Sequence, residues 1–467
     1  MRLGEIIEGT GASIVKGSPD TRISSICSDS RKACPGALFI AVKGFAADGH
    51  DYIDAAVEAG ADAVISTDRR GLALCAAGFY GNPSHKLKLV GITGTNGKTT
   101  TVTLLYRFFM DLGYNCGLLS TIANYVGRER SETANTTADP ITINSLLARM
   151  VDEGCEYCFM EVSSIGVEQE RVAGLKFAAG IFSNLTHDHL DYHKTFAEYL
   201  RCKKLFFDAL DADAVAITNI DDRNGMVMVQ NTAARVVTYS CRTLADHTCR
   251  IMEQSFEGMQ LKIDGVEAWT RLIGRHNAYN ILAIYSTAVE LGCEPTEVLV
   301  GISKLGSAPG RLENLRGPRD LSVIIDYAHT PDALENVLGT LREIAPEKEL
   351  VCLFGCGGDR DRTKRPEMAA IAEKMSDRIF VTSDNCRTEK PEAIMDDIRA
   401  GFTREGLAKA IFITDRREAI RTAILTAKEG AAILLAGKGH ETYQIIGTEH
   451  LHFDERQIVE ETFKTID

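Results

Sequence analysis

Short apolar runs rich in β-branched residues alternate along the chain with longer stretches in which apolar residues recur every three or four positions. The short runs have the length of buried strands, and the longer stretches have the period of amphipathic helices. One such helix is predicted over 99–113, where the residues at 102, 105, 108, 109 and 112 are apolar. The predicted strands are 62–67, 87–93, 177–185, 213–220, 321–328, 350–355, 378–383, 410–414 and 431–437. Strands that alternate with helices in this way indicate an α/β fold with parallel sheets.

Two turn-rich segments interrupt the alternation and mark the predicted domain boundaries. One is GNPSHK (81–86), which precedes a strand, and the other is GSAPGRLENLRGPRD (306–320), which is rich in glycine and proline. A chain of 467 residues is also long enough for about three domains. We therefore predict three α/β domains, comprising residues 1–86, 87–314 and 315–467.

Composition and charge exclude several classes of function. The chain is 45% hydrophobic and 25% charged, as in ordinary globular proteins, and no apolar run reaches the roughly 18 residues that span a bilayer. The chain has 52 basic and 65 acidic residues, and the resulting net charge of −13 argues against a protein that coats nucleic acid or anionic membranes. Glu5 and Glu8 stand where a signal peptide needs apolar residues, so we expect a cytoplasmic protein. Its thirteen cysteines are then expected to be reduced, and the spacing of Cys155 and Cys158 to be coincidental.

The segment VGITGTNGKTT (90–100) lies between a predicted strand and a predicted helix, which is the setting of a phosphate-binding loop. Glycines let backbone amides turn toward phosphate oxygens, and the helix N-terminus adds partial positive charge. Lys98 would neutralise the β- and γ-phosphates, and Thr99 or Thr100 would reach Mg²⁺. Only the shorter G-x-x-G-K-T core fits the consensus, and the alternative is a glycine-rich turn that merely joins strand to helix. We predict mononucleotide binding by Gly94, Thr95, Asn96, Gly97, Lys98, Thr99 and Thr100.

A second polar cluster, SNLTHDHLDYHKTF (183–196), places three histidines and two aspartates between His187 and His193. It is compatible with a transition-metal site, because two imidazoles can bind one ion, and also with a polar loop that caps the next helix. ATP brings Mg²⁺, which prefers oxygen ligands but tolerates one imidazole. Glu161, at the end of the strand-like CFMEV (158–162), is the natural carboxylate to hold that ion.

Six segments occur in an order that resembles the Mur ligases. They are GTNGKTT, EVSS, NLTHDHLDYH, GRHNAYN (274–280), APGRLE (308–313) and DYAHTPDAL (326–334). With SDSR (28–31) and GKGHETYQ (437–444), the resemblance covers nearly the whole chain. It implies a small N-terminal α/β domain that binds UDP, a central P-loop-type ATPase domain and a C-terminal Rossmann-like domain.

The resemblance also assigns ATP and metal contacts. Lys98 and Thr99 match phosphate and Mg²⁺ contacts, and Glu161 and His189 match metal ligands. Lys203 matches a lysine that is carbamylated in the family and that bridges Mg²⁺ as an anion, and with Lys98, Glu161 and His189 it forms the expected catalytic set. From its sequence alone, Lys203 would pass as a solvated helix charge. The further ATP contacts implied are Asn277, Arg311 and Asp326.

Contacts to two other substrates follow from the same resemblance. A UDP-sugar dipeptide is expected at Ser30, Asn135, Thr136, Thr137, Ser163, Gln169 and Arg171, and an amino acid at Arg360, Asp384, Asn385, Arg387, Gly437 and Glu441. An arginine fork binds carboxylates in bidentate fashion, so Arg387 suits a distal carboxylate. Two positions depart from the family pattern: Ile165 replaces the usual histidine, and Cys386 replaces the usual proline. Without the resemblance, the basic segment 355–366 would be read as a solvated loop.

The implied activity is that of an ATP-dependent, ADP-forming acid–amino-acid ligase. It would join meso-diaminopimelate to the D-Glu side-chain carboxylate of UDP-MurNAc-L-Ala-D-Glu through an acyl phosphate, in peptidoglycan precursor synthesis. The expected cofactor is Mg²⁺, ATP is a substrate, and a monomer is expected. The alternatives are the lysine-adding ligase, a folate-polyglutamate ligase, and, from a different class, a nucleotide switch or kinase.

Overall fold

A computed structural model describes residues 1–44, 47–133, 135–186 and 190–466. At Leu190 and Asp191 it describes the backbone but not the side chains. The chain forms two compact units. The first comprises Met1–Arg250, Ile263–Gly265 and Tyr279–Ile302, and the second comprises Ile251–Lys262, Val266–Ala278 and Ser303–Asp467. Within the described ranges, no helix is long and apolar enough to cross a membrane.

The first unit begins with a small sheet in the order β1-β4-β3-β2. β3 (Ala37–Val42) is its centre, because alternate side chains enter two different cores: Leu38 and Ile40 pack on one face, and Phe39 and Ala41 on the other. A strand buried on both faces reads as a continuous apolar run, as ALFIAV does. The other elements of this part are α1 (Leu3–Ile7), β1 (Ser13–Lys16), β2 (Ser25–Cys27), α2 (Ile53–Glu58), β4 (Ala63–Thr67) and α3 (Arg69–Phe79).

The first unit holds eight neighbouring strands of a larger sheet, in the order β12-β11-β10-β5-β9-β6-β7-β8, and the strands from β12 to β6 are parallel. β5 (Lys88–Thr93) lies between β9 and β10. The chain runs from β5 to β6 and β9 on one side and then crosses to β10 on the other side, so the direction of the crossovers reverses at β5. Open α/β sheets bind ligands at such a switch point, beyond the carboxyl ends of the strands. The strands around β5 are β6 (Cys116–Leu119), β7 (Asn124–Val126), β8 (Glu129–Ser131), β9 (Tyr157–Glu161), β10 (Ala179–Phe182), β11 (Val215–Asn219) and β12 (Arg235–Ser240).

Helices lie between the strands in the chain, and α5, α6, α8 and α9 contribute to the apolar core of this sheet. The helices are α4 (Lys98–Asp111), α5 (Pro140–Asp152), α6 (Ser164–Glu168), α7 (Leu190–His193), α8 (Phe196–Asp208), α9 (Gly225–Val229), α10 (Arg275–Glu290) and α11 (Pro295–Lys304). α5 illustrates why they form where they do: Asp139 accepts a hydrogen bond from the Thr142 N–H as the N-cap, and Pro140 occupies the first helical position. Three further strands, β13 (His247–Ser255), β14 (Gly258–Ile263) and β15 (Val266–Thr270), lie between β12 and α10 in the chain.

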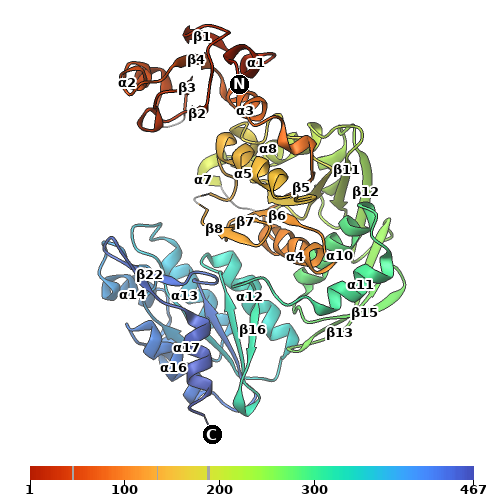
Figure 1. The fold of residues 1–467 in the computed structure, drawn as a ribbon. Helices are drawn as coiled ribbons and strands as arrows, with labels where there is room; N and C mark the ends of the chain where they lie inside the picture. The colour runs from red at the N-terminus through yellow and green to blue at the C-terminus, as the bar shows by residue number, and fades with distance from the viewer. Residues whose placement is uncertain (45–46, 134, 187–189, 467) are drawn as a thin grey trace. The chain divides into compact units, whose positions relative to one another are not determined.

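The second unit contains a six-stranded sheet in the order β16-β17-β21-β18-β19-β20, parallel except for β16. In β18, Cys352 and Phe354 face the core under α12, α13 and α14, whereas Val351 and Leu353 face the core under α16 and α17. α16 and α17 lie side by side on that second face (Figure 1). The strands are β16 (Glu313–Arg316), β17 (Ser322–Asp326), β18 (Leu350–Phe354), β19 (Arg378–Val381), β20 (Ala410–Phe412), β21 (Ala432–Ala436), β22 (Tyr443–Ile446) and β23 (Glu449–His452). The helices are α12 (Pro331–Ile344), α13 (Lys364–Met375), α14 (Pro391–Arg399), α15 (Arg404–Lys409), α16 (Arg416–Thr426) and α17 (Glu455–Phe463).

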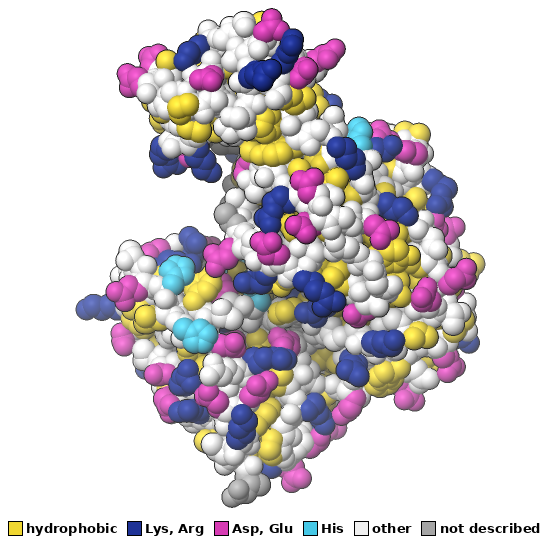
Figure 2. Space-filling model, viewed as in Figure 1, with side chains coloured by type: hydrophobic (Ala, Val, Ile, Leu, Met, Phe, Trp, Pro, Cys, Tyr) yellow, Lys and Arg dark blue, Asp and Glu magenta, His cyan; other side chains and the backbone are white. Residues whose placement is uncertain are grey.

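The α/β class is confirmed, and each of the nine predicted strands contains an observed strand, trimmed by up to five residues. The helix predicted over 99–113 is α4. On the face shown in Figure 2, acidic and basic side chains are interspersed, so the net charge of −13 is not gathered there into one acidic patch. All thirteen cysteines lie in the described ranges and are free thiols.

Candidate active site

The loop between β5 and α4 has a backbone that only glycine accommodates at two points. Gly94 and Gly97 have φ values of +148° and +90°. A Cβ atom on Gly94 would stand 2.0 Å from Ser183 Oγ, and one on Gly97 would stand 2.4 Å from Asn280 Oδ1. Glycine is therefore required at both positions for two reasons: the φ values are positive, and a side chain would clash with a neighbouring residue.

The segment that leaves β10 holds this loop from the side. Ser183 Oγ donates to the Asn96 carbonyl at 2.7 Å, and Asn184 exchanges two hydrogen bonds with Asn96, both 3.0 Å long. Thr95 Oγ1 lies 3.1 Å from the Tyr199 hydroxyl of α8. Thr99 and Thr100 are buried in the first turn of α4. The predicted loop residues 94–100 are thus one rigid turn at a helix N-terminus, which is how phosphate oxygens are bound.

Two lysines meet inside this turn. Lys98 Nζ donates to the carbonyls of Gly94 and Thr95, both at 2.9 Å. Lys203 Nζ, from α8, donates to the same Gly94 carbonyl at 2.8 Å and lies 4.6 Å from the centre of the Tyr199 ring. The Lys203 side chain is buried, at 1% exposure, whereas its neighbour Lys204 pairs with Asp208 at 2.5 Å. Lys203 is therefore not the solvated helix charge that its sequence context suggests.

Glu161 ends β9 and is also buried. Its Oε1 accepts a hydrogen bond from the Thr121 N–H at 2.8 Å, and its carbonyl accepts one from Thr137 Oγ1 at 3.0 Å. The first bond joins the carboxylate to the chain around 121, and the second joins the Glu161 backbone to the predicted dipeptide segment 135–137. His189, the other predicted metal ligand, lies outside the described residues.

A cavity of about 160 Å³ brings the two lysines together with most of the predicted dipeptide contacts. It is lined by Lys98, Asn135, Thr136, Thr137, Ser163, Ser164, Ile165, Arg171 and Lys203. Ile165 gives this cavity an apolar patch where the family pattern has histidine.

A larger cavity of about 710 Å³ adjoins the first and shares Asn135 and Arg171 with it. It holds Ser30 and Gln169, two further predicted contacts. The residues that line it are Ser28, Asp29, Ser30, Arg31, Val42, Gly44, Ala47, Gly49, Tyr52, Arg69, Leu72, Asn135, Asp139, Pro140, Gln169 and Arg171. All seven predicted contacts to the UDP-sugar dipeptide therefore line one of the two cavities.

Arg171 is one of the two residues that line both cavities. Its Nη1 donates to the Thr137 carbonyl at 2.6 Å, and its Nε and Nη2 donate to Gln169 Oε1 at 3.0 and 2.6 Å. Burial lowers the pKa of the guanidinium, which nonetheless stays protonated at neutral pH. Sequence analysis missed Arg31, Arg69 and Tyr52 on the larger cavity, because single residues in unrelated segments carry no local pattern.

In the second unit, four predicted amino-acid contacts surround a buried lysine that sequence analysis missed. Lys438 is fully buried, and its Nζ donates to Asn385 Oδ1 at 2.9 Å and to the Tyr443 carbonyl at 2.8 Å. It also forms ion pairs with Asp384 at 3.1 Å and with Glu441 at 3.5 Å. Burial raises the pKa of Asp384, but the neighbouring cations, Lys438 first, more than offset this, so the pKa is lowered. Gly437 completes the group, since a Cβ there would stand 3.2 Å from Asp384 Oδ2.

Arg387 and Arg360, the two predicted arginines, both approach Gly357. A Cβ on Gly357 would lie 3.0 Å from Arg387 Nη1 and 3.8 Å from Arg360 Cγ. Arg387 has a φ of +50°, and its Nη1 donates to the Gly358 carbonyl at 2.9 Å. Its backbone N–H donates to the Ile445 carbonyl, which fixes Arg387 beside β22. The six predicted contacts thus lie in the loops that follow β18, β19 and β21, at the carboxyl end of the sheet.

Arg311 and Asp326, two of the predicted ATP contacts, also lie together in this unit. Asp326 accepts hydrogen bonds from the N–H groups of Leu312 and Ala328 at 2.8 and 2.9 Å. Burial raises the pKa of Asp326, and the nearby Arg311 opposes that rise. Arg311 stacks over Tyr327, with 5.1 Å between the guanidinium carbon and the ring centre. Asn277 is buried in the first turn of α10 and donates to the Ile273 carbonyl at 2.8 Å.

A glycine-lysine turn between a parallel strand and a helix, opening on a cavity with a second buried lysine, defines a nucleotide-dependent α/β enzyme. The chain matches three models of one family: "Mur ligase family, catalytic domain" over 22–85, "Mur ligase middle domain" over 92–288, and "Mur ligase, glutamate ligase domain" over 310–439. The chain belongs to the Mur ligase family and has its three α/β domains. It is an ATP-dependent acid–amino-acid ligase.

The relatives agree along the full length. The chain is 48% identical to the UDP-N-acetylmuramoyl-L-alanyl-D-glutamate–2,6-diaminopimelate ligase of Parabacteroides distasonis, covering 100% of this chain and 99% of that one. It is 49% identical to the ligase of the same name from Phocaeicola vulgatus, covering 99% of each. A solved structure of a ligase with this name matches with a TM-score of 0.74 at 30% identity, covering 100% of this chain and 99% of that one.

Proposed function

We propose that this ligase joins meso-diaminopimelate to the D-Glu side-chain carboxylate of UDP-MurNAc-L-Ala-D-Glu, with conversion of ATP to ADP and phosphate. The full-length relatives with this named activity support the assignment. The observation that carries it is the pair of adjoining cavities that share Asn135 and Arg171, with Lys98 and Lys203 on the smaller one. A long nucleotide-sugar peptide fits such a pair, because its bulky end and its reacting carboxylate need separate spaces.

In this proposal, the larger cavity takes the UDP-sugar and the smaller one takes the D-Glu side chain. Ser30, with Arg31 and Arg69, lines the wider space, where cations suit a diphosphate. Arg171, held by Gln169 and Thr137, stands at the junction and suits a carboxylate of the dipeptide. Thr136, Thr137 and Ser163 supply short polar groups beside the lysines.

The chemistry follows from the poor reactivity of a carboxylate. A carboxylate oxygen attacks the γ-phosphorus of ATP, the bond to the β-phosphate oxygen breaks, and ADP leaves. The diaminopimelate amine then attacks the acyl carbon, phosphate leaves, and the amine loses a proton to give the amide. Lys98 neutralises charge on the transferred phosphoryl group, and the rigid glycine turn fixes its position.

The described donors fit Mg²⁺, which favours oxygen ligands. The Thr99 hydroxyl and the Glu161 carboxylate are such donors, and we propose that they hold the ion with His189 and Lys203. Lys203 would serve as a carbamate, because a bare ammonium repels a cation. When bound, Mg²⁺ neutralises phosphate charge, and a carbamate on Lys203 would place an anion beside the Lys98 ammonium.

For the amine substrate, we propose the loops of the second unit. Arg387 and Arg360 suit the distal carboxylate of diaminopimelate, which lysine lacks. Asp384 and Glu441 suit an ammonium, and Lys438 holds both through short contacts. The ATP contacts Asn277, Arg311 and Asp326 remain part of the proposal, as do domain boundaries near 86 and 314, a cytoplasmic location and a monomeric state.

The acyl phosphate provides the test. The enzyme is incubated with UDP-MurNAc-L-Ala-D-Glu and ATP without any amine, and the mixture is reduced with borohydride. The proposal predicts that the D-Glu side-chain carboxylate is converted to an alcohol, detected by mass spectrometry, only when ATP is present. Full amide synthesis with diaminopimelate in a parallel reaction, together with no trapped alcohol, would overturn the acyl-phosphate route.

A further inference from the structure

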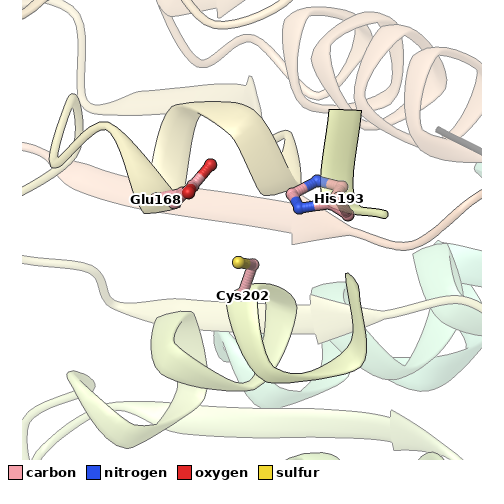
Figure 3. Close-up of side chains that lie close together, drawn as sticks. All are labelled: Glu168, His193 and Cys202. Carbon is pink, nitrogen blue, oxygen red and sulfur yellow. The ribbon is translucent and has the colours of Figure 1, made fainter. Parts of the chain in front are cut away.

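Three side chains with different metal-binding atoms converge in the first unit, outside the cavity lining. They are Glu168 at the end of α6, His193 at the end of α7 and Cys202 in α8. One ligand atom from each lies within 4.8 Å of the other two. Figure 3 shows the carboxylate, the imidazole and the thiol directed into one space between the three helices.

The surroundings of this cluster favour a cation. His193 and Cys202 are buried, and Glu168 Oε2 is buried without a hydrogen-bond partner among the described residues. A buried carboxylate oxygen without a partner is rare, and a bound cation is one of the few groups that satisfy it. Cys202 Sγ also contacts the Glu198 carboxylate at 3.7 Å, and Glu198 in turn is held by Arg201.

The imidazole is already oriented for a ligand role. His193 Nε2 lies 2.8 Å from Ser164 Oγ, and metal-binding histidines generally use their second nitrogen in such a bond. The ligating atom is then Nδ1. Two of the three helices also carry residues of the smaller cavity: Ser164 begins α6, and Lys203 follows Cys202 directly in α8.

We propose that Glu168, His193 and Cys202 form a binding site for a thiophilic divalent cation of the Zn²⁺ class. A carboxylate, an imidazole and a thiolate are the donors of three-residue zinc sites, and a thiolate disfavours Mg²⁺. Binding releases the Cys202 thiol proton, and it needs shifts of about 1 Å from the present separations to reach zinc bond lengths. The ion ties together the helices that carry Ser164 and Lys203. This site shares no residue with the Mg²⁺ donors proposed above, so its test does not depend on them.

Cobalt spectroscopy tests the proposal, because a Co²⁺–thiolate bond gives a near-ultraviolet charge-transfer band that oxygen and nitrogen ligands do not give. The full chain, freed of metal and without ATP, is titrated with Co²⁺ in millimolar Mg²⁺, so that oxygen-rich sites are occupied. We expect one equivalent of Co²⁺ to produce the band and one equivalent of Zn²⁺ to remove it.

Three variants assign the ligands. Cys202→Ser abolishes the band, whereas Cys34→Ser, at an exposed thiol, leaves it unchanged. Glu168→Gln, a mild change at a partly exposed position, weakens Co²⁺ binding at least tenfold. Co²⁺ binding without the charge-transfer band, no binding at all, or an unchanged band in Cys202→Ser would each overturn the proposal.

Discussion

Lys98 and Lys203 donate to one acceptor, the carbonyl oxygen of Gly94, at 2.9 and 2.8 Å. They reach it from α4 and α8, more than a hundred residues apart in the chain. Two ammonium groups at one oxygen repel each other unless an anion intervenes, and the proposed reaction would supply anions at this point: the phosphates of ATP and the carboxylate that receives phosphate. The proposed mechanism therefore gives the two lysines different tasks, which can be separated by experiment.

Lys98→Ala removes the cation that is proposed to neutralise the transferred phosphoryl group. Losing one preorganised electrostatic group typically costs about 10²–10³ in turnover, so we expect kcat to fall at least that far. Steady-state release of phosphate measures it, with the exposed Lys374→Ala as the matched surface control. Turnover within tenfold of wild type would reject the role of Lys98.

Lys203→Ala removes the proposed carbamate together with the amine. We expect a comparable loss, and because the missing group is a carboxylate-like anion, short carboxylic acids such as formate or acetate should restore part of the activity. The control is Lys204→Ala, one position along the same helix, where the lysine pairs with Asp208. This variant should keep its activity, and the added acids should not change it. Rescue by short alkylamines in place of acids would show that the amine itself is used.

Lys438→Met tests the positioning role of the buried lysine in the second unit. It deprives Asn385, Asp384 and Glu441 of their shared cation, and hydrogen bonds to charged groups contribute about 1.5–3 kcal/mol. We expect the KM for the amine substrate to rise about tenfold or more, with the KM for UDP-MurNAc-L-Ala-D-Glu unchanged. An equal rise in both constants would indicate general damage to the fold.

Glu389 gives the second unit a predictable sensitivity to acid. The fully buried Arg365 donates to both Glu389 oxygens, at 2.9 and 2.8 Å, and lowers the pKa of Glu389 from 4.5 to about 2. A depressed carboxyl pKa stabilises the fold above about 4.5, and that stability is lost as the pH falls toward about 2.

The matched variant is Glu389→Gln, which keeps the shape and removes the charge. We expect the difference between the melting temperatures of wild type and variant to be largest at pH 6 and clearly smaller at pH 3.5, and to vanish only toward pH 2. A difference that is the same at the two pH values would contradict the linkage.

The phosphate loop and the parallel strands could be predicted because their signals are local. Gly94, Gly97 and Lys98 are close in sequence and define the turn by themselves. The short strands β6, β7 and β8 had no such signal, since runs of three or four residues such as CGLL and NYV do not stand out from loops.

What could not be predicted depends on distant segments. Lys203 reads as a surface charge until α8 is packed against the loop after β5. Lys438 contacts Asn385 and Asp384 only because the loop after β21 packs against the loop after β19. Glu168, His193 and Cys202 come from three helices and share no sequence motif. Local patterns record the period of an element, whereas tertiary packing decides which elements meet.

The proposed reaction of this ligase adds an amine with a second carboxylate to an activated D-Glu side chain. Wild-type enzyme is given UDP-MurNAc-L-Ala-D-Glu, ATP and Mg²⁺ with meso-diaminopimelate, with L-lysine or with neither, and both phosphate release and product mass are followed. We predict stoichiometric phosphate and tripeptide product with diaminopimelate, far lower kcat/KM with lysine, and no sustained phosphate release without amine. Sustained ATP hydrolysis that needs no amine, or a preference for lysine over diaminopimelate, would contradict the account.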